Sequence, residues 1–297
     1  MGGKKLLNVA ELDCVFISYD EPNAESNWAD LSNHCMWAKR VHGVKGSDAA
    51  HKEAARQSDT EWFVTVDGDN LVDPNFFGQE IEVADNICAM TWPALNSVNG
   101  LRYGNGSLKI WKKDYVLNIR THEAAEKDSS QVDFCWEKNY KALFKCYSTS
   151  VIDASPFQAW RAGFREGVKM NLVNGVLPKE NSPSTMFWHN LQRLKVWMSV
   201  GAHKENGLWA ILGARQGCYM TNCTDWDYVN VRDFDFLKEL WKSVEATHVG
   251  TSVEYFGNLL KEKFFLDIPL LDRTTSEFVY GVIDDQYRQM TAQAEHV

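Results

Sequence analysis

The sequence predicts an α/β fold, in which a sheet is flanked by helices and the C-terminal part is mainly helical. Short apolar runs rich in β-branched and aromatic residues alternate with helical patterns in the first quarter of the chain. Turn-forming residues follow these runs, and beyond Asp225 apolar residues recur at helical spacing. A chain of 297 residues with 44% hydrophobic content can bury a large core.

The first elements are expected in the order strand, helix, strand, helix, strand, over residues 12–18, 27–39, 40–44, 49–57 and 61–66. Gly46, Ser47 and Asp48 precede the second helix and are suited to cap it. This order implies βαβ crossovers and parallel strands with helices on both faces. Ligands of such sheets bind outside the carboxyl ends of the strands, so Tyr19–Glu21 and Asp67–Asp69 should line one crevice.

Later segments give weaker patterns. We expect a strand over 87–92, a glycine-broken loop entering a strand over 100–111, and helices over 159–170, 190–200 and 207–215. The segment 123–153 is ambiguous. The helical tail is expected to pack on the sheet.

Composition excludes some classes of function. The net charge of −9 does not favour diffuse binding to nucleic acid, although a local basic face is compatible with it. No run of 18 apolar residues is present, so no membrane span is expected, and the N-terminus is typical of a cytoplasmic protein. The seven cysteines are scattered and lack a Cys-x-x-Cys pair, which predicts buried free thiols.

The triplet Asp67-Gly68-Asp69 follows an apolar strand directly. Mg²⁺ and Mn²⁺ prefer carboxylates, water and substrate phosphates, so two aspartates at the tip of a rigid strand suit a metal-diphosphate site. A solvated turn is the first alternative. The second, an EF-hand loop, fails because Val72 and Gly78 stand where Gly and Glu are required.

The first hundred residues resemble the nucleotide-binding half of a GT-A glycosyltransferase, which implies a Rossmann-like mixed sheet. The run from Glu205 to Gly217 is similar to the family-2 pattern of an acidic residue that opens a helix. In that family this residue is the catalytic base. The usual Glu-Asp pair is Glu205-Asn206 here, so only Glu205 can deprotonate an acceptor. A favourable charge in the first helical turn is the competing interpretation.

Longer strings narrow the resemblance to phage glycosyltransferases associated with TET/JBP oxygenases. The strings lie at residues 17–24, 41–46, 103–106, 159–167 and 205–207. The resemblance covers roughly residues 12–235 and implies transfer of a sugar from a UDP-sugar to a 5-hydroxymethylpyrimidine, such as 5-hydroxymethylcytosine, in phage DNA. The expected location is then the cytoplasm of the infected bacterium. It also implies a division into a nucleotide-sugar-binding half (1–112), an acceptor-binding half (113–224) and a helical extension (225–297).

The donor site is expected to combine strand-end and glycine-loop residues, namely Ser18, Tyr19, Asp20, Glu21, His42, Gly43, Asp48, Asp67, Gly68, Gly104, Asn105, Gly106 and Lys109. Aromatic and acidic side chains suit a base and ribose, the glycines allow main-chain amides to approach the sugar, and Lys109 suits a phosphate. An ordinary Asp-Glu-Pro turn, a core histidine at position 42 and a plain glycine loop are the alternatives.

The metal, Mn²⁺ or Mg²⁺, is assigned to Asp69 with help from Asp67. A later histidine, His203 or His189, is a candidate additional ligand, and at most one of the two is expected to serve. Glycosyltransferases that act on a protein or glycan, nucleotidyltransferases, and a carbohydrate- or DNA-binding module remain alternative functions.

A basic stretch over 155–195 carries six Lys and Arg residues against two acids, with interleaved aromatics that include Phe187 and Trp188. Basic groups position a phosphate backbone, and aromatic faces stack unpaired bases. We therefore expect the acceptor DNA at Trp160, Arg161, Arg165 and Lys169. An amphipathic helix with core aromatics and a solvated basic side is the alternative.

Overall fold

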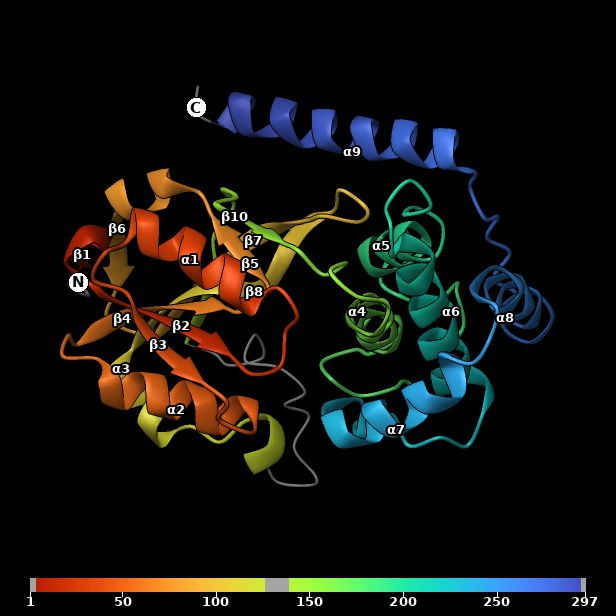
Figure 1. Cartoon of the computed structure of the whole chain (residues 1–297), viewed down its shortest axis with the longest axis horizontal. Helices are drawn as coiled ribbons and strands as arrows, with labels where there is room; N and C mark the ends of the chain where they lie inside the picture. Colours follow the sequence, from red (N-terminus) through yellow and green to blue (C-terminus); the bar gives the residue numbers. More distant parts are fainter. Residues whose placement is uncertain (1–3, 126–138, 295–297) are drawn as a thin grey trace. The chain divides into compact units, whose positions relative to one another are not determined.

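The computed structural model describes residues 4–125 and 139–294. Two compact units are present (Figure 1). Unit 1 holds the chain up to Asn96 together with Arg102–Val151, and unit 2 holds Ser97–Leu101 together with the chain from Ile152 onward. The division of binding roles at residues 112 and 224 stays a prediction.

Unit 1 is built on an eight-stranded sheet in the order β3-β2-β4-β8-β7-β10-β5, with β9 paired to β7. The strands are β2 (Asp13–Ser18), β3 (Lys39–His42), β4 (Trp62–Asp67), β5 (Asn70–Val72), β7 (Ala89–Asn96), β8 (Arg102–Lys112), β9 (Tyr140–Ala142) and β10 (Ser148–Ser150). β2 is parallel to both β3 and β4, whereas β8 is antiparallel to β4 and β7. The sheet is therefore mixed.

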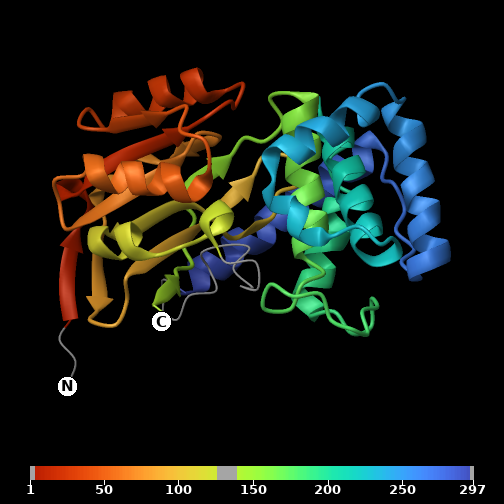
Figure 2. The ribbon, with the colours of Figure 1, turned by 90° about the horizontal axis from the view of Figure 1, so that it is seen from below.

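Helices cover both faces of this sheet. Figures 1 and 2 show α1 (Ala24–His34) on one side of β2 and α2 (Ser47–Gln57) on the other. The remaining elements of unit 1 are α3 (Lys113–Asn118), a two-stranded arm of β1 (Lys4–Asn8) and β6 (Glu80–Ala84), and the 3₁₀ turns η1 (Val9–Glu11), η2 (Pro74–Gly78) and η3 (His122–Ala124). The predicted α/β class, a mixed sheet flanked by helices, is confirmed.

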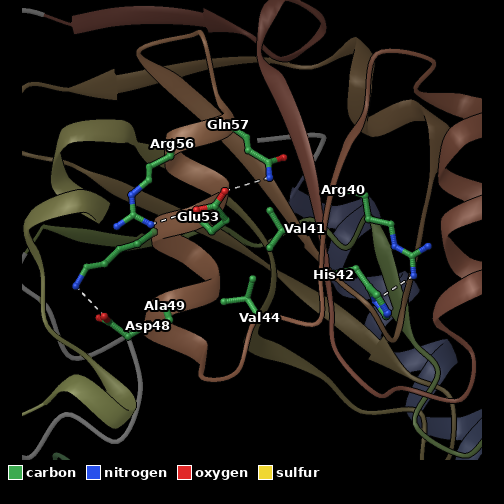
Figure 3. A pocket seen from close by; sticks show the side chains of 10 residues that line it. Arg40, Val41, His42, Val44, Asp48, Ala49, Glu53, Arg56 and Gln57 are labelled. Atoms are coloured by element: carbon green, nitrogen blue, oxygen red, sulfur yellow. Dashed lines mark hydrogen bonds and ion pairs between the residues drawn. The ribbon is translucent and has the colours of Figure 1, made fainter.

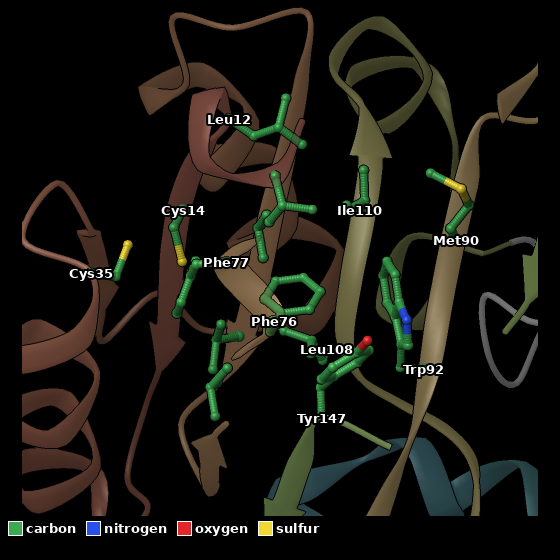
Figure 4. Packing of buried hydrophobic residues seen from close by; sticks show 14 of the residues in the cluster. Leu12, Cys14, Cys35, Phe76, Phe77, Met90, Trp92, Leu108, Ile110 and Tyr147 are labelled. Atoms are coloured by element: carbon green, nitrogen blue, oxygen red, sulfur yellow. The ribbon is translucent and has the colours of Figure 1, made fainter. Parts of the chain in front are cut away.

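Alternation along the strands creates two cores. On β4, Val64 and Val66 join the cluster beneath α1, which also holds Phe76 and Trp92 (Figure 4). Phe63 points to the opposite face, where it packs in a second cluster with residues of α2. Strands that are buried on both faces are continuously apolar. This is why β2 and β4 were recognisable in the sequence.

Several boundaries differ from the prediction. α1 begins at Ala24 and ends at His34, because the chain turns at Cys35 and Ala38 instead of continuing the helix. The strand expected over 87–92 lies at Ala89–Asn96, and the run expected over 100–111 as a loop entering a strand is almost entirely strand, in β8. Strands β1 and β6 were missed.

The cap of α2 also differs. Gly46 is the N-cap residue and has φ +96°, so it contributes no side chain. The carboxylate of Glu123 instead accepts hydrogen bonds from the backbone N–H groups of Asp48, at 3.2 Å, and Ala49, at 2.9 Å. A cap supplied from 74 residues along the chain has no local sequence signal.

Unit 2 is helical in its described residues. Its helices are α4 (Pro156–Lys169), α5 (Trp188–Trp197), α6 (Gly207–Cys223), α7 (Phe234–Val244), α8 (Val249–Phe264) and α9 (Arg273–Ala294), with the 3₁₀ turn η5 (Tyr228–Arg232). The mainly helical C-terminal part is confirmed. The packing of its tail on the sheet stays a prediction.

α4 and α6 pack side by side along a seam of four glycines (Figure 2). A Cβ added at Gly163 or Gly167 would overlap the backbone of α6, and one added at Gly213 or Gly217 would overlap the backbone of α4. The two backbones are therefore in direct contact, as small residues permit.

Arg215 on α6 is a buried cation that binds three backbone carbonyls. Its guanidinium donates to Met198 O at 3.0 Å, Val253 O at 3.0 Å and Ile268 O at 3.1 Å. Burial lowers the pKa of Arg215 to about 10. One side chain thereby ties the end of α5, the middle of α8 and the segment after α8 to α6.

Six cysteines are free thiols, of which Cys14, Cys35 and Cys218 are buried, while Cys135 lies outside the described residues. The expectation of free thiols is confirmed for the described cysteines. Within residues 4–125 and 139–294, no helix combines the length and apolar character that crossing a bilayer demands.

Candidate active site

Three parallel strands of unit 1 end together. In the register of the sheet, Ile17 lies opposite Asp67 and Ser18 lies opposite His42. A Cβ added at Gly68 would stand 2.9 Å from both Glu21 Oε2 and Ser18 Cβ, so only glycine fits there without a shift. The segments Tyr19–Glu21 and Asp67–Asp69 therefore lie side by side at the carboxyl edge, as predicted.

Asp67 ends β4 and is half-buried. Lys109, which is only 4% exposed, lies on the neighbouring β8 with its Nζ 3.5 Å from Asp67 Oδ2. The sequence predicted that Lys109 faces a donor phosphate. In the structure its ammonium group lies next to Asp67 and offsets part of that carboxylate's charge.

Asp69 lies in the turn between β4 and β5, also half-buried. Asn70 Nδ2 donates to Asp69 Oδ1 at 2.6 Å, and Asp69 O accepts a hydrogen bond from Val151 N at 2.7 Å. Behind them, Ser150 Oγ donates to Asn70 Oδ1 at 3.2 Å, and Ser107 Oγ is 3.1 Å from Ser150 Oγ.

This relay, the buried chain of hydrogen bonds from Ser107 through Ser150 and Asn70, holds the Asp69 carboxylate against the sheet. Sequence reasoning missed Asn70, Ser107 and Ser150. The signal available was an amide next to an acidic triplet, but its partner Ser150 is 80 residues away in the chain, beyond the reach of a local motif.

A second cluster lies at the ends of β2 and β3. Ser18 Oγ is 2.9 Å from His42 Nδ1 and accepts from Arg40 Nε at 3.2 Å. Arg40 also forms a two-pronged ion pair with Glu25, at 2.6 and 3.0 Å, and this bonding lowers the pKa of the Glu25 carboxyl. Arg40, which the sequence did not single out, thus orients Ser18 and His42.

Aromatic groups support the cluster. The Arg40 guanidinium lies 5.8 Å from the ring centroids of both Phe16 and Trp28, which fixes its plane. The neighbouring Tyr19 side chain is 41% exposed, and its backbone N–H donates to Glu21 Oε2 at 2.7 Å. Asp20 is exposed beside it.

A cavity of about 620 Å³ adjoins this cluster between β3 and α2. Figure 3 shows Arg40 and His42 on one side of β3, with Val41 and the side chains of α2 on the other. Gly43, with φ +75°, turns the chain away at the end of β3. The cavity has the size of a small-molecule site.

Asp48 lines the cavity, but its carboxylate is engaged. It is 5% exposed, binds Lys52 Nζ at 2.7 Å, and accepts a hydrogen bond from Thr121 N at 3.0 Å. These contacts tie α2 to the segment after α3. Asp48 therefore has a structural role, and its predicted contact with the donor stays a prediction.

The glycine run lies in β8. Between the pairs Trp92↔Leu108 and Ala94↔Tyr103 the register shifts, so the backbone from Gly104 to Ser107 bulges away from β7. Gly104 is exposed. The side chain of Asn105 and the surroundings of Gly106 lie outside the described residues.

In unit 2, Glu205 is exposed and stands two residues before the start of α6. Among the described residues it has no hydrogen-bond or ion-pair partner. Asn206, the N-cap of α6, donates from Nδ2 to Asp153 O at 2.9 Å. The carboxylate of Glu205 thus lies near the N-terminus of α6 but does not cap the helix.

His203 lies against α9. Its Nδ1 is 3.0 Å from Ser276 Oγ, and its ring packs edge-on against Tyr280. Its Nε2 is buried and has no hydrogen-bond partner within the described part of the chain. Burial, followed by the charge of Lys204, lowers the pKa of His203. His189, the other candidate ligand, is exposed.

The four residues of α4 that were predicted to contact DNA differ in their exposure. Trp160 is completely buried, packs on Phe164 and Trp241, and donates from Nε1 to Gln216 Oε1 at 2.9 Å. Its predicted role in stacking a base is wrong for this structure, because the ring belongs to the core of unit 2. The amphipathic alternative holds for this residue.

Arg161, Arg165 and Lys169 share the other face of α4 at four-residue spacing and are half-buried. The guanidinium groups of Arg161 and Arg165 each lie 5.1 Å from the ring centroid of Phe234. The three cations therefore form a ridge, in which Phe234 packs against the two arginines and Lys169 Nζ lies 3.8 Å from Glu166 Oε1.

No cluster of three or more His, Cys, Asp or Glu side chains suited to a metal occurs within residues 4–125 and 139–294. A full protein cage of the zinc type is therefore absent from the described part. A site for Mg²⁺ or Mn²⁺ needs only one or two carboxylates, since substrate phosphates and water complete it.

Comparisons with known proteins give a limited result. No family model and no curated protein matches this chain. Among solved structures, a glycosyltransferase involved in glycosylation of the major capsid of PBCV-1 is 18% identical, with 35% of this chain and 62% of that chain covered and a TM-score of 0.25.

HddC from Yersinia pseudotuberculosis, complexed with GMP-PN, is 11% identical, with 47% and 93% covered and a TM-score of 0.33. The glycosyltransferase GlyE of Streptococcus pneumoniae TIGR4 is 12% identical, with 80% and 66% covered and a TM-score of 0.28. The chain thus spans 62% of the length of the first of these structures. At such TM-scores the function has to be argued from the residues of the site.

Proposed function

We propose that this protein is a glycosyltransferase that uses a divalent metal ion and a nucleotide-sugar donor, as in the GT-A fold. The observation that carries the proposal is the pair of half-buried carboxylates, Asp67 and Asp69, at the tip of β4. They lie beside the Ser18–Arg40–His42 cluster at the carboxyl edge of parallel strands, the edge at which open α/β sheets bind ligands.

The acidic pair fits Mn²⁺ or Mg²⁺ in the chemistry of its donors, which are carboxylate oxygens. Lys109 offsets part of the charge of Asp67, so Asp69 is the stronger ligand and Asp67 supports it. When bound, the metal neutralises the departing diphosphate as a Lewis acid. His203 gains less support, because its Nε2 is buried and its Nδ1 contacts Ser276.

The donor nucleoside would occupy the ends of β2 and β3. Tyr19 offers an exposed aromatic face, and His42, which Ser18 and Arg40 hold in place, offers an exposed ring at the 620 Å³ cavity. Gly68 lets the turn after β4 lie directly against Ser18 and Glu21, since any larger residue there would overlap their side chains. A UDP-sugar is the donor that we propose.

The acceptor would be a hydroxymethylated base of DNA, such as 5-hydroxymethylcytosine. Its hydroxyl oxygen attacks the anomeric carbon, a new C–O bond forms, and the bond between the sugar and the diphosphate breaks to release UDP. In an inverting reaction Glu205 takes the hydroxyl proton. The ridge of Arg161, Arg165 and Lys169 would contact phosphates of the strand.

The proposal is tested by incubating the protein with Mn²⁺, a panel of UDP-sugars and DNA that contains 5-hydroxymethylcytosine. Mass spectrometry of the digested nucleosides should show a hexose added to the modified base, with UDP as the other product. Pyrophosphate release from a nucleoside triphosphate would instead indicate nucleotidyl transfer. Absence of both transfer and UDP-sugar hydrolysis with every metal would contradict an enzymatic role.

A further inference from the structure

Three consecutive side chains at the start of α5, Phe187, Trp188 and His189, are exposed and form what we name the aromatic patch. Trp188 is 75% exposed and Phe187 is 47% exposed, although large aromatic side chains are normally buried. The rings of Phe187 and His189 are stacked, with centroids 5.6 Å apart and planes 10° apart. Stacked aromatic rings that are exposed to solvent are unusual on a protein surface.

Local structure holds the aromatic patch outward. The preceding turn is closed by the hydroxyl of Thr185, which donates to Glu180 O and Ser182 O at 3.0 Å each. Met186 is 9% exposed and Leu194 is fully buried, and they anchor the segment on either side of the patch. The aromatic side chains are therefore excluded from the core by the packing of their neighbours.

The segment that carries the aromatic patch is positively charged. The chain holds 40 acidic residues in 297, yet none occurs between Asn181 and Lys204. On α5, Lys195 follows Trp188 by seven residues and Arg193 follows His189 by four, so each basic residue shares a helix face with a ring. Aromatic faces beside cations suit a ligand that carries both stacked rings and negative charge.

We propose that the aromatic patch stacks unpaired bases of a DNA strand while Arg193 and Lys195 contact its phosphates. This site rests on the proposed function, because the strand would be the acceptor DNA, and it replaces the role that the sequence assigned to the buried Trp160. Base–aromatic stacking tolerates any sequence, since every base has a π-face. A neutral glycan would use the rings but would have no use for the cations.

The test measures binding of a fluorescent single-stranded oligonucleotide and its abasic counterpart by anisotropy, with no donor or metal present. The wild-type protein should prefer the strand that carries bases. The Phe187→Ala, Trp188→Ala variant should bind that strand roughly ten-fold to a hundred-fold more weakly and bind the abasic strand like the wild type. Trp188→Phe should keep most of the preference.

Charge is tested separately. Arg193→Gln with Lys195→Gln should weaken binding to both strands and reduce the dependence on salt concentration. Phe278→Ala is the matched control, because this ring is 70% exposed on α9 beside Glu277 and should not affect binding to either strand.

Equal affinity of the wild-type protein for the two strands would overturn the stacking site. So would wild-type affinity in the Phe187→Ala, Trp188→Ala variant. A dimer of the wild-type protein that this variant fails to form, seen by sedimentation, would overturn the DNA site and assign the patch to a subunit interface. The binding assay needs no sugar transfer, so its result stands even if the protein is not a glycosyltransferase. Sugar transfer by a protein that shows no preference for the strand with bases would contradict the stacking site alone.

Discussion

At the scale of single residues, Asp69 is the position on which the proposed chemistry depends most. Replacing it with Asn keeps the shape and a partner for Asn70 but removes the negative charge that a cation requires. We expect Asp69→Asn to lower metal-dependent sugar transfer roughly a hundred-fold or more. The measurement is the initial rate of UDP release at several Mn²⁺ concentrations.

Asp30→Asn is the control for this change, because Asp30 is a half-exposed aspartate of α1 that lies outside the proposed metal site. It should show the wild-type rate. A turnover close to that of the wild type in Asp69→Asn would remove the metal from this turn.

His203 makes a prediction about pH. Its pKa is lowered in the folded protein, so between the lowered pKa and the ordinary value of 6.5 the unfolded chain binds more protons than the folded one. The stability that the neutral ring contributes is present above pH 6.5 and is lost as pH falls through the folded pKa. Protonation would also place an N–H at the buried Nε2.

We therefore expect His203→Asn to flatten the decline in the free energy of unfolding as pH falls from 7.5 to 5, measured by urea titration. An identical decline in the wild type and His203→Asn would show that other groups cause it.

At the scale of elements, the ridge on α4 is the feature to test. Arg161→Ala with Arg165→Ala removes two cations that share one helix face, and should reduce the slope of log affinity for DNA against log salt by about 2. The measurement is a salt titration of binding to duplex DNA. Lys242→Ala with Lys261→Ala, two exposed lysines of the same unit, serves as the control.

Among the elements, those with a continuous apolar pattern were predictable from sequence, whereas those that depend on distant partners were not. β2 and β4 were recognised because Val15, Val64 and their neighbours are buried on both faces. The arm of β1 and β6 was missed, since its strands stabilise each other across more than seventy residues.

The site divides in the same way. The acidic triplet and the strand-end residues carry a local signal, but the relay behind Asp69 and the Arg40 cluster depend on side chains that only the folded sheet brings together. Trp160 shows the reverse error. Its basic neighbours suggested a binding face, and only the structure shows that the indole ring points inward.

At the scale of the whole molecule, the proposed donor site lies entirely within unit 1. We expect UDP with Mn²⁺ to slow amide hydrogen exchange at the ends of β2 and β3 and in the turn after β4, because a ligand stabilises the state that it binds. Helices α7 and α8 should exchange as in the free protein. Protection confined to unit 2 would place the donor elsewhere.

The glycine seam between α4 and α6 limits how the protein can be redesigned. Along this seam the backbones of α4 and α6 are in contact. Any larger residue at one of the four glycines would force the two helices apart, so directed evolution cannot substitute these positions. Selection for a new acceptor therefore has to act at positions outside this seam. Mutational scanning should show Gly163, Gly167, Gly213 and Gly217 as intolerant of every larger residue.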